Sequence, residues 1–163
     1  MVQRFNGTDW EVLGTSGFSD GEAQKISLAI DSTDTPYVAY MDFGHSNKVT
    51  IQKWDGFYRQ VVGSPGISSG QAQYVSLAID STDTPYVAYR DDAHSNQATV
   101  MKFNSGTNLR EAVGPSQGFS DGRADYISLA IGSGDNPYVA YMDYANDYKA
   151  TVQKWNGGSW EIV

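Results

Sequence analysis

Residues 26–40 read ISLAIDSTDTPYVAY, and the stretch recurs as VSLAIDSTDTPYVAY from Val75 and as ISLAIGSGDNPYVAY from Ile127. The three copies begin 49 and then 52 residues apart. Each copy holds an apolar run, a polar turn that ends in proline, and a second run in which large and small residues alternate. A repeated unit of this length, built from short strands, indicates an array of β-sheets.

Each unit predicts four antiparallel strands. In the first unit we expect them at residues 26–31, 37–40, 49–54 and 58–62. An acidic loop follows the second strand, and Asp55-Gly56 is a strong hairpin signal between the third and fourth strands. No segment has a helical period long enough to compete. Four strands per unit match one blade of a β-propeller, so we predict an all-β propeller fold.

The two ends of the chain resemble each other. Residues 2–14 (VQRFNGTDWEVLG) match residues 152–163 (VQKWNGGSWEIV), so the chain opens with the third and fourth strands of a blade and closes on a complete blade. We predict a single array over residues 1–163, divided into a partial blade and three blades at residues 1–14, 15–63, 64–114 and 115–163.

Three blades are too few for a closed ring, because propellers close with about four to eight. Open sheet edges and apolar faces favour assembly. We therefore expect a homo-oligomer, in the first place a dimer, closed into six blades, or into seven if the two spare strand pairs combine. The alternatives are a fragment of a longer natural array and an engineered repeat protein.

Composition excludes several classes of partner. The chain has no cysteine, 11 Lys and Arg against 19 Asp and Glu, and a net charge of −8. Scattered basic residues in an acidic chain argue against nucleic acid, and no apolar run is long enough to span a membrane. We expect no cofactor and no dedicated metal site; an acidic surface suits neutral ligands such as sugars.

The acidic loops between the second and third strands are the candidate ligand site. They fall on one rim of the array, where propellers usually bind ligands. The candidate residues are Asp42, His45, Asn47, Asp91, Asp92, His94, Asn96, Asp143, Asn146 and Asp147. A ring of carboxylates could hold Ca²⁺, but we favour a solvated rim that keeps the protein soluble. The histidines recur at one repeat position, whereas a catalytic residue is normally unique, so we expect no catalytic residue.

Aromatic residues recur as well. We expect Trp54, Phe103 and Trp155, which share one repeat position, to pack between blades. We align Trp10 and Trp160 with Tyr58 and expect them to be partly exposed on the outer strand.

The P-Y-V-A-Y strand, the K-W-N-G-x-x-W hairpin at Lys154 and the G-F-S-D-G loops at Gly17 and Gly118 resemble repeats of bacterial cell-surface β-propellers of the sialidase-like, BNR-repeat type. The resemblance covers the whole chain, although the Ser-x-Asp-x-Gly-x-x-Trp box of that family is degenerate here. The Trp-Asp-Gly hairpin is also similar to that of small fucose-binding lectins, whose incomplete chains oligomerise into six-bladed propellers. These resemblances imply secretion or surface display, and binding of glycans.

Two functions follow from these observations. The first is a non-enzymatic scaffold or binding module that self-assembles and binds glycans. The second is a fragment of a sialidase-like glycoside hydrolase, which requires an arginine cluster, a tyrosine nucleophile and a glutamate partner. The arginines occupy unrelated repeat positions, and Glu22 alone among the glutamates falls on the candidate rim. We therefore predict that the protein is not an enzyme.

Overall fold

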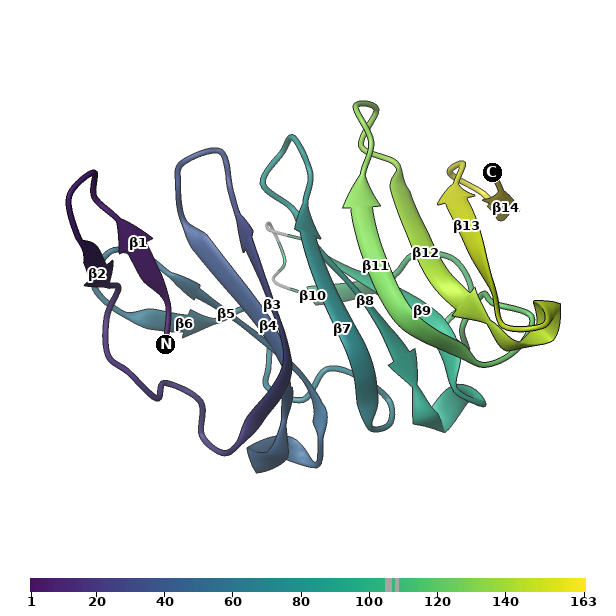
Figure 1. Ribbon diagram of the computed structural model, residues 1–163, viewed down its shortest axis with the longest axis horizontal. Coiled ribbons are helices and arrows are strands. Elements are labelled where there is room, and N and C mark those ends of the chain that lie inside the picture. The colour runs from purple at the N-terminus through teal and green to yellow at the C-terminus, as the bar shows by residue number, and fades with distance from the viewer. Residues whose placement is uncertain (105–106, 108) are drawn as a thin grey trace.

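The computed structural model describes residues 1–104, 107 and 109–163, and its regular structure in these residues is three four-stranded sheets, one two-stranded sheet and three short 3-10 turns (Figure 1). Blade 1 comprises β3 (Ala23–Ile30), β4 (Pro36–Asp42), β5 (Lys48–Trp54) and β6 (Arg59–Val61). Blade 2 comprises β7 (Ala72–Ile79), β8 (Pro85–Asp91), β9 (Gln97–Asn104) and β10 (Leu109–Ala112). Blade 3 comprises β11 (Ala124–Ile131), β12 (Pro137–Asp143), β13 (Lys149–Trp155) and β14 (Trp160–Ile162). The predicted all-β fold of four-stranded units is confirmed.

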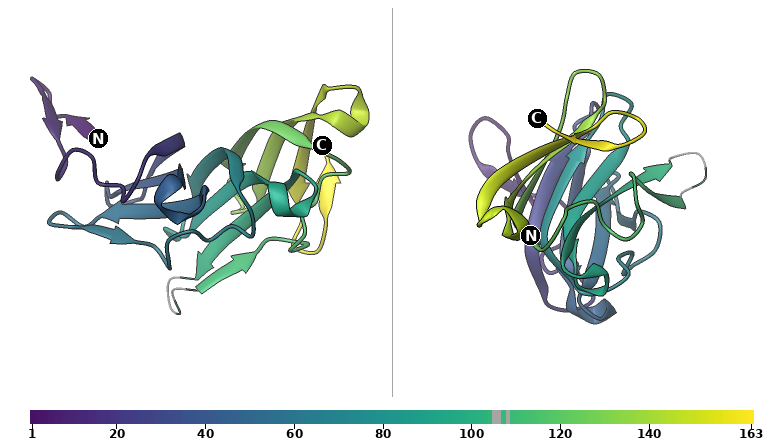
Figure 2. Two further views of the ribbon diagram at one scale, coloured as in Figure 1. Left: turned by 90° about the horizontal axis from the view of Figure 1, so that it is seen from below. Right: turned by 90° about the vertical axis from the view of Figure 1, so that its right-hand side faces the viewer.

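The remaining strands, β1 (Gln3–Phe5) and β2 (Trp10–Val12), form a separate hairpin before blade 1. Within every blade, neighbours in sequence pair antiparallel. The innermost strands β3, β7 and β11 lie side by side in the array (Figure 1). The two termini lie at opposite ends of it (Figure 2). None of the helices in the described residues is long and apolar enough to cross a membrane.

The repeated turn between the first two strands of a blade has a clear local cause. In blade 1 the Asp31 carboxylate accepts hydrogen bonds from the backbone N–H groups of Thr33 and Thr35, both at 2.9 Å. Burial would raise the Asp31 pKa, but these hydrogen bonds outweigh it and hold the pKa below its usual value. Pro36 then begins β4, where its missing N–H removes no ladder bond. The turn is thus closed by its own side chains.

The core lies between the blades. One apolar cluster joins blades 1 and 2, and a second joins blades 2 and 3. Ala39 and Ala88, at the small position of the PYVAY strand, are fully buried in these two clusters, as predicted. Phe103 packs in the first cluster and Trp155 against the second. Ala140, the third alanine of the series, is half-buried, because none of the described blades packs on that face of blade 3.

The opposite end of the array also has an uncovered face. Ile26, Leu28 and Ile30 on β3 are 63, 53 and 50% exposed. Their counterparts in blade 2, Val75 and Leu77, are 8 and 6% exposed, because blade 1 covers them. The exposed isoleucines and leucine mark where a preceding blade would pack.

The β1–β2 hairpin occupies part of that place. Val2 is buried against Val38 and Tyr40 of β4. The Leu13 N–H donates to the Val2 carbonyl at 3.0 Å, and Val62, Val113 and Val163 make the same bond to Ile51, Val100 and Val152 at 2.9 to 3.0 Å. The hairpin therefore sits as the outer strand pair of a blade whose two inner strands are missing.

The strand register corrects one alignment. Trp10 pairs with Phe5 and Trp160 with Trp155, as Arg59 pairs with Trp54. Trp10 and Trp160 therefore correspond to Arg59, and their alignment with Tyr58 was wrong by one residue. Tyr58 and the two tryptophans are all aromatic, so the sequence alone favoured aligning them.

Candidate functional site

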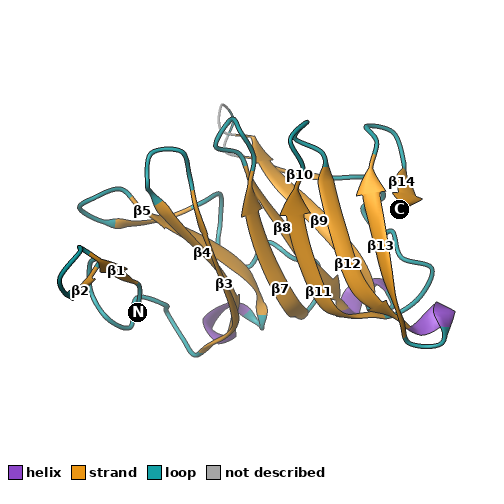
Figure 3. Ribbon diagram, turned by 45° about the horizontal axis from the view of Figure 1, so that its top comes forward, coloured by secondary structure: helices purple, strands orange, loops and turns teal. Residues whose placement is uncertain are grey.

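The candidate rim is built from three 3-10 turns that follow the second strand of each blade: η1 (Phe43–His45), η2 (Asp92–His94) and η3 (Tyr144–Asn146). Figure 3 shows these turns in purple, at the end of the blades away from the Asp-Ser-Thr-Asp turns. All ten candidate residues lie in or beside them, three in blade 1, four in blade 2 and three in blade 3. Gly21 and Gly70, from the loops that enter blades 1 and 2, lie directly against Gly44 and Ala93 of the turns, so the two kinds of loop share this rim.

The aspartate that precedes each turn is buried. Asp42, Asp91 and Asp143 cap the turns, and each accepts a hydrogen bond of 2.9 to 3.0 Å from the backbone N–H two residues later. Each has a second partner: Thr50 donates to Asp42 at 2.8 Å, the Gly70 N–H to Asp91 at 2.9 Å and Thr151 to Asp143 at 3.0 Å. These three carboxylates hold the loops in shape and do not face solvent.

The two histidines are held by the same aspartates. His45 Nδ1 lies 2.8 Å from Asp42 Oδ2, and His94 Nδ1 lies 3.1 Å from Asp91 Oδ2. In the residues that the structure describes, neither imidazole has a hydroxyl as its hydrogen-bond partner. A nucleophile–base pair needs such contact. Each histidine–aspartate pair is part of the loop that recurs in blades 1 and 2.

Asn47 and Asn96 act through their backbone. They adopt φ of 60° and 62°, a left-handed conformation that asparagine tolerates well. Their carbonyls accept hydrogen bonds from Ala72 and Ala124 of the next blade, at 2.9 and 3.0 Å. The polar groups left outward on the rim are Asp147, whose side chain is 91% exposed, Asp92 at 37%, His45 at 33% and the exposed Asn146.

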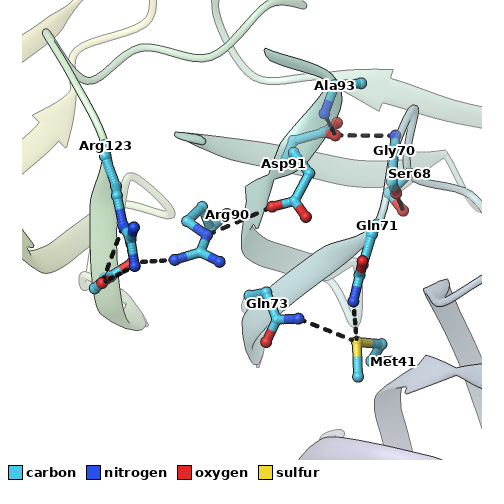
Figure 4. A network of polar contacts seen from close by, with 11 residues as sticks. Met41, Ser68, Gly70, Gln71, Gln73, Arg90, Asp91, Ala93 and Arg123 are labelled. Carbon is cyan, nitrogen blue, oxygen red and sulfur yellow. Dashed lines mark hydrogen bonds and ion pairs between the residues drawn. The ribbon is translucent and has the colours of Figure 1, made fainter. Parts of the chain in front are cut away.

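A buried ionic cluster between blades 2 and 3 was missed by sequence reasoning (Figure 4). Arg90 on β8 forms an ion pair with Asp125 on β11, and Arg123 Nη2 lies 2.8 Å from the same carboxylate. Asp92 Oδ1 lies 3.6 Å from Arg90 Nε. Burial would raise the Asp125 pKa, but hydrogen bonds and charge from the two arginines hold it below its usual value.

We call the contact between two neighbouring blades a seam. The first seam, between blades 1 and 2, has a neutral counterpart of this cluster. There, Gln73 Nε2 points at Met41 Sδ at 3.6 Å, and Gln71 approaches the same sulfur from 3.9 Å (Figure 4). Met41 corresponds to Arg90, and Gln73 to Asp125. The two departures from the repeat compensate each other. This compensation is the signal that could have revealed the pair from the sequence.

The inner strands carry a strained position that holds a long side chain in each blade. Lys25, Tyr74 and Tyr126 sit at a β-bulge with φ of 52° to 54°, which bulky residues seldom adopt. The Tyr74 and Tyr126 ring centroids are 5.0 Å apart, and Lys25 Nζ lies 5.7 Å from the Tyr74 ring centroid. Tyr126 is 68% exposed at the end of this stack. Among the described residues, no group of three His, Asp or Glu side chains could hold a metal ion.

No protein-family model matches the chain, and no curated protein sequence does. Among solved structures, an engineered GH43 glycoside hydrolase with endo-xylanase and exo-arabinofuranosidase activity superposes with a TM-score of 0.56 and 13% identity over 87% of this chain and 31% of that chain. A fucose lectin from Kordia zhangzhouensis, in complex with methyl-fucoside, superposes with a TM-score of 0.52 and 11% identity, over 85% of this chain and 96% of that chain. A glycosyl hydrolase from Bacteroides ovatus superposes with a TM-score of 0.51 and 11% identity, over 88% of this chain and 49% of that chain.

These likenesses show the fold alone: the chain has a β-propeller-type architecture, shared with glycoside hydrolases and a lectin. The chain spans about a third of the engineered hydrolase and nearly all of the lectin. The finer resemblance to sialidase-like repeats is not matched by these neighbours and stays a prediction.

Proposed function

We propose that this chain is a non-enzymatic β-propeller module that binds glycans weakly at its acidic rim and closes into a ring with a second copy of itself. The observation that carries the non-enzymatic part is the placement of Asp42, Asp91 and Asp143. Each is buried and bonded to its own loop.

Glycoside hydrolysis normally requires two carboxyl groups, roughly 5 to 10 Å apart, that flank the bond to be cleaved. One of them must present a proton to the leaving group. The capping aspartates instead are buried and accept hydrogen bonds from backbone and threonine donors, so their oxygens are already engaged within the loops. They are therefore poorly suited to be general acids.

The outward groups of the rim suit binding. His45, Asp92 and Asp147 present polar atoms to solvent from three successive blades. Similar loops repeated around a ring offer several weak sites, and a multivalent ligand gains affinity from engaging more than one of them. The lectin that aligns over 96% of its own length gives this proposal a fold precedent in a carbohydrate-binding protein.

Self-association is supported by the two uncovered faces. The face of β3 exposes Ile26, Leu28 and Ile30, and the far face of blade 3 exposes Ala150 and Val152. Apolar sheet faces of this kind are normally covered in a stable protein. A ring of six blades covers both and falls within the known range of about four to eight.

A fragment of a glycoside hydrolase is the second candidate. It is favoured by the hydrolase neighbours, of which this chain spans a part only. In that case the catalytic carboxylates would come from segments beyond these three blades, and the chain by itself would bind without turnover.

Glycan arrays with and without Ca²⁺, together with fluorogenic sialoside, xyloside and arabinofuranoside assays, test the proposal. We expect no turnover, and weak glycan binding that His45→Ala combined with Asp92→Ala reduces. Asp9→Ala, on the exposed β1–β2 turn away from the rim, is the matched control. Turnover abolished by one substitution in a single blade would contradict the proposal, as would binding indifferent to the rim pair.

A further inference from the structure

The seams between blades repeat one set of hydrogen bonds. Across the first seam the Leu77 N–H donates to Ser27 Oγ, and across the second the Leu129 N–H donates to Ser76 Oγ, each at 3.0 Å. The next members of the series stand at the two ends of the array. They are the Leu28 N–H on blade 1 and Ser128 Oγ on blade 3, a donor and an acceptor that would complete a third bond.

A second bond set repeats at the opposite rim. Ser32 donates through its N–H and its hydroxyl to Asp83, at 2.8 and 2.7 Å, and Ser81 does the same to Asp135, at 2.9 and 2.7 Å. The two ends again hold matching halves. Asp34 on blade 1 is the acceptor of the series and Ser133 on blade 3 is its donor.

A third set lies on the loop side. In the first seam the Ile67 N–H donates to Val49 O at 2.7 Å, and the Val49 N–H donates to Ser68 Oγ at 3.1 Å. In the second seam the Phe119 N–H donates to Ala98 O at 2.9 Å, and the Ala98 N–H donates to Ser120 Oγ at 3.0 Å. At the ends of the array, Phe18 and Ser19 hold the positions of Ile67 and Ser68, and the exposed Ala150 holds that of Val49.

The side chains facing out of the two ends also match. The seam between blades 1 and 2 joins Met41 to Gln73, and the ends carry Met142 and Gln24. The inner stack ends on the exposed ring of Tyr126, while Lys25 stands at its beginning. Both end pairs repeat a contact that a seam already contains. Met142 and Gln24 match the methionine–glutamine contact, and Tyr126 and Lys25 match the contact between an aromatic ring and a lysine.

From these matching halves we infer that blade 3 of a second copy docks on blade 1 head to tail, as one more seam of the same kind. The inference rests on the proposed self-association and names its surfaces. The second copy's Ser133 would donate to Asp34, and its Val152 would cover Leu28. Head-to-tail contacts form a ring when the rotation closes, and six is the one multiple of three within the range of about four to eight blades.

The β1–β2 hairpin stands in the way of this docking. It occupies the place that β13 and β14 of the second copy would take, because Val2 packs against Val38 and Tyr40 of β4. Arg59 Nη2 also donates to the Leu13 carbonyl at 3.1 Å, as Trp160 Nε1 of blade 3 donates to the Val113 carbonyl of blade 2 at 3.0 Å. β1 has one strand partner, β2, whereas β13 pairs with both β12 and β14. Moving β1–β2 away breaks no ladder, and moving β13–β14 breaks one. We therefore expect the hairpin to be displaced when the second copy docks, so it competes with assembly from within the chain.

The same geometry decides against a seventh blade. In a two-fold symmetric ring, the hairpins of the two copies lie at the two junctions, on opposite sides of the ring. They cannot meet to form one blade.

Complementation of blocked faces tests the docking. Leu28→Asp blocks the face of blade 1, and Val152→Asp blocks that of blade 3; both positions are exposed in the single chain, so each variant should fold. We expect each variant alone to be monomeric by sedimentation velocity, and an equimolar mixture to form a heterodimer through its one intact pair of faces.

Other outcomes overturn the inference. A Val152→Asp variant that still dimerises would mean that blade 1 contacts blade 1, and a mixture that stays monomeric at every concentration would remove the head-to-tail contact. A monomeric wild type would instead refute the proposed self-association itself, so the two failures are distinguishable.

Removal of the hairpin tests the competition. Deleting Met1–Leu13 should lower the dimer dissociation constant by roughly tenfold, since the competitor no longer holds the site. Val2→Asp, which loosens the hairpin without shortening the chain, should act in the same direction, and Thr8→Ala on its exposed turn should not. Weaker dimerisation of both the deletion and Val2→Asp would show that the hairpin is part of the contact.

Discussion

The hairpins at the two ends of the chain have nearly the same sequence and the same register, yet different surroundings. Asn6 and Asn156 accept hydrogen bonds from the second and third backbone N–H groups of their turns, at 2.8 to 3.0 Å. Trp160 stacks on Phe119 with 4.0 Å between ring centroids, and its Nε1 donates to Val113 O at 3.0 Å. Trp10, at the same position of its hairpin, is 67% exposed.

This difference separates local from tertiary causes. The turn residues determine that both hairpins form, because the same bonds close them in both places. Burial depends on a neighbouring blade, which β13–β14 has and β1–β2 has in part. The same contrast between closed seam and open end recurs along the whole array. Each prediction below compares a position in a seam with its counterpart at an end or in the other seam. Stability is to be measured in the Leu28→Asp background, which keeps the ends open.

The largest contrast is expected between the two tryptophans. Trp160→Ala should destabilise the fold by about 2 to 4 kcal/mol, somewhat less than removal of a fully buried tryptophan, because the ring stacks on Phe119 and is half-buried. Trp10→Ala should change the free energy of unfolding by no more than about 0.5 kcal/mol. Urea unfolding compares the two. Equal losses would show that the terminal hairpins are equally well packed.

The small alanine position gives the next contrast. Ala88 is fully buried between blades 2 and 3, so Ala88→Leu should overpack that seam and cost roughly 1 to 3 kcal/mol. Ala140→Leu, on the open face, should cost less than about 0.5 kcal/mol. The melting temperatures of the two variants test this prediction. A melting temperature unchanged by Ala88→Leu would mean that the blade faces are assigned the wrong way round.

The two seams differ in their ionic content. Arg90→Met should cost about 1 to 2 kcal/mol, because the buried Asp125 keeps Arg123 as its one partner in the cluster. Adding Asp125→Gln converts the site to the Met41–Gln73 chemistry of the first seam and should recover most of the loss. If the double variant is as unstable as the single one, the two seams are not interchangeable.

Acid titration sharpens this comparison. The folded pKa of Asp125 lies below its ordinary value of 3.8, so its contribution to stability is complete above that pH and is lost as the pH falls through the folded pKa. The stability of the wild type should therefore fall more steeply below pH 3.8 than that of the double variant. Parallel curves would show that this carboxylate is not coupled to folding.

The smallest contrast concerns the serine–aspartate bonds. Ser81→Ala removes the hydroxyl hydrogen bond to the half-buried Asp135, leaves the backbone N–H bond in place, and should cost about 0.5 to 1 kcal/mol. Ser133→Ala removes the equivalent hydroxyl at an exposed position of blade 3, and should be neutral in the single chain. Chemical unfolding of the two variants, recorded side by side, measures this difference. A cost for Ser133→Ala equal to that of Ser81→Ala would remove the distinction between seam and end.

Much of the fold could be predicted because the repeat supplies the same evidence three times. The strand pattern, the buried alanines and the grouping of acidic loops on one rim all follow from alternation and turn chemistry. The roles of the rim residues could not be predicted as well. Whether Asp42 faces solvent or caps a turn depends on backbone angles that the letters do not encode, and its burial follows from that cap.

Two further features depended on comparing repeats in the correct register. Arg90 and Asp125 are 35 residues apart, and each looks like a single departure from its repeat until the two strands are placed across a seam. The correspondence of Trp160 with Arg59 requires a register that the structure supplies: Trp160 stacks on Phe119, and Arg59 lies over the Phe18 ring, 4.0 Å from its centroid.

The mass of the wild-type particle in solution tests the central claim most directly. Light scattering coupled to size exclusion, over a range of protein concentrations, should give twice the chain mass of 17.8 kDa, because two sets of three blades close the open faces. A particle that keeps the mass of one chain at micromolar and higher concentrations would contradict the account.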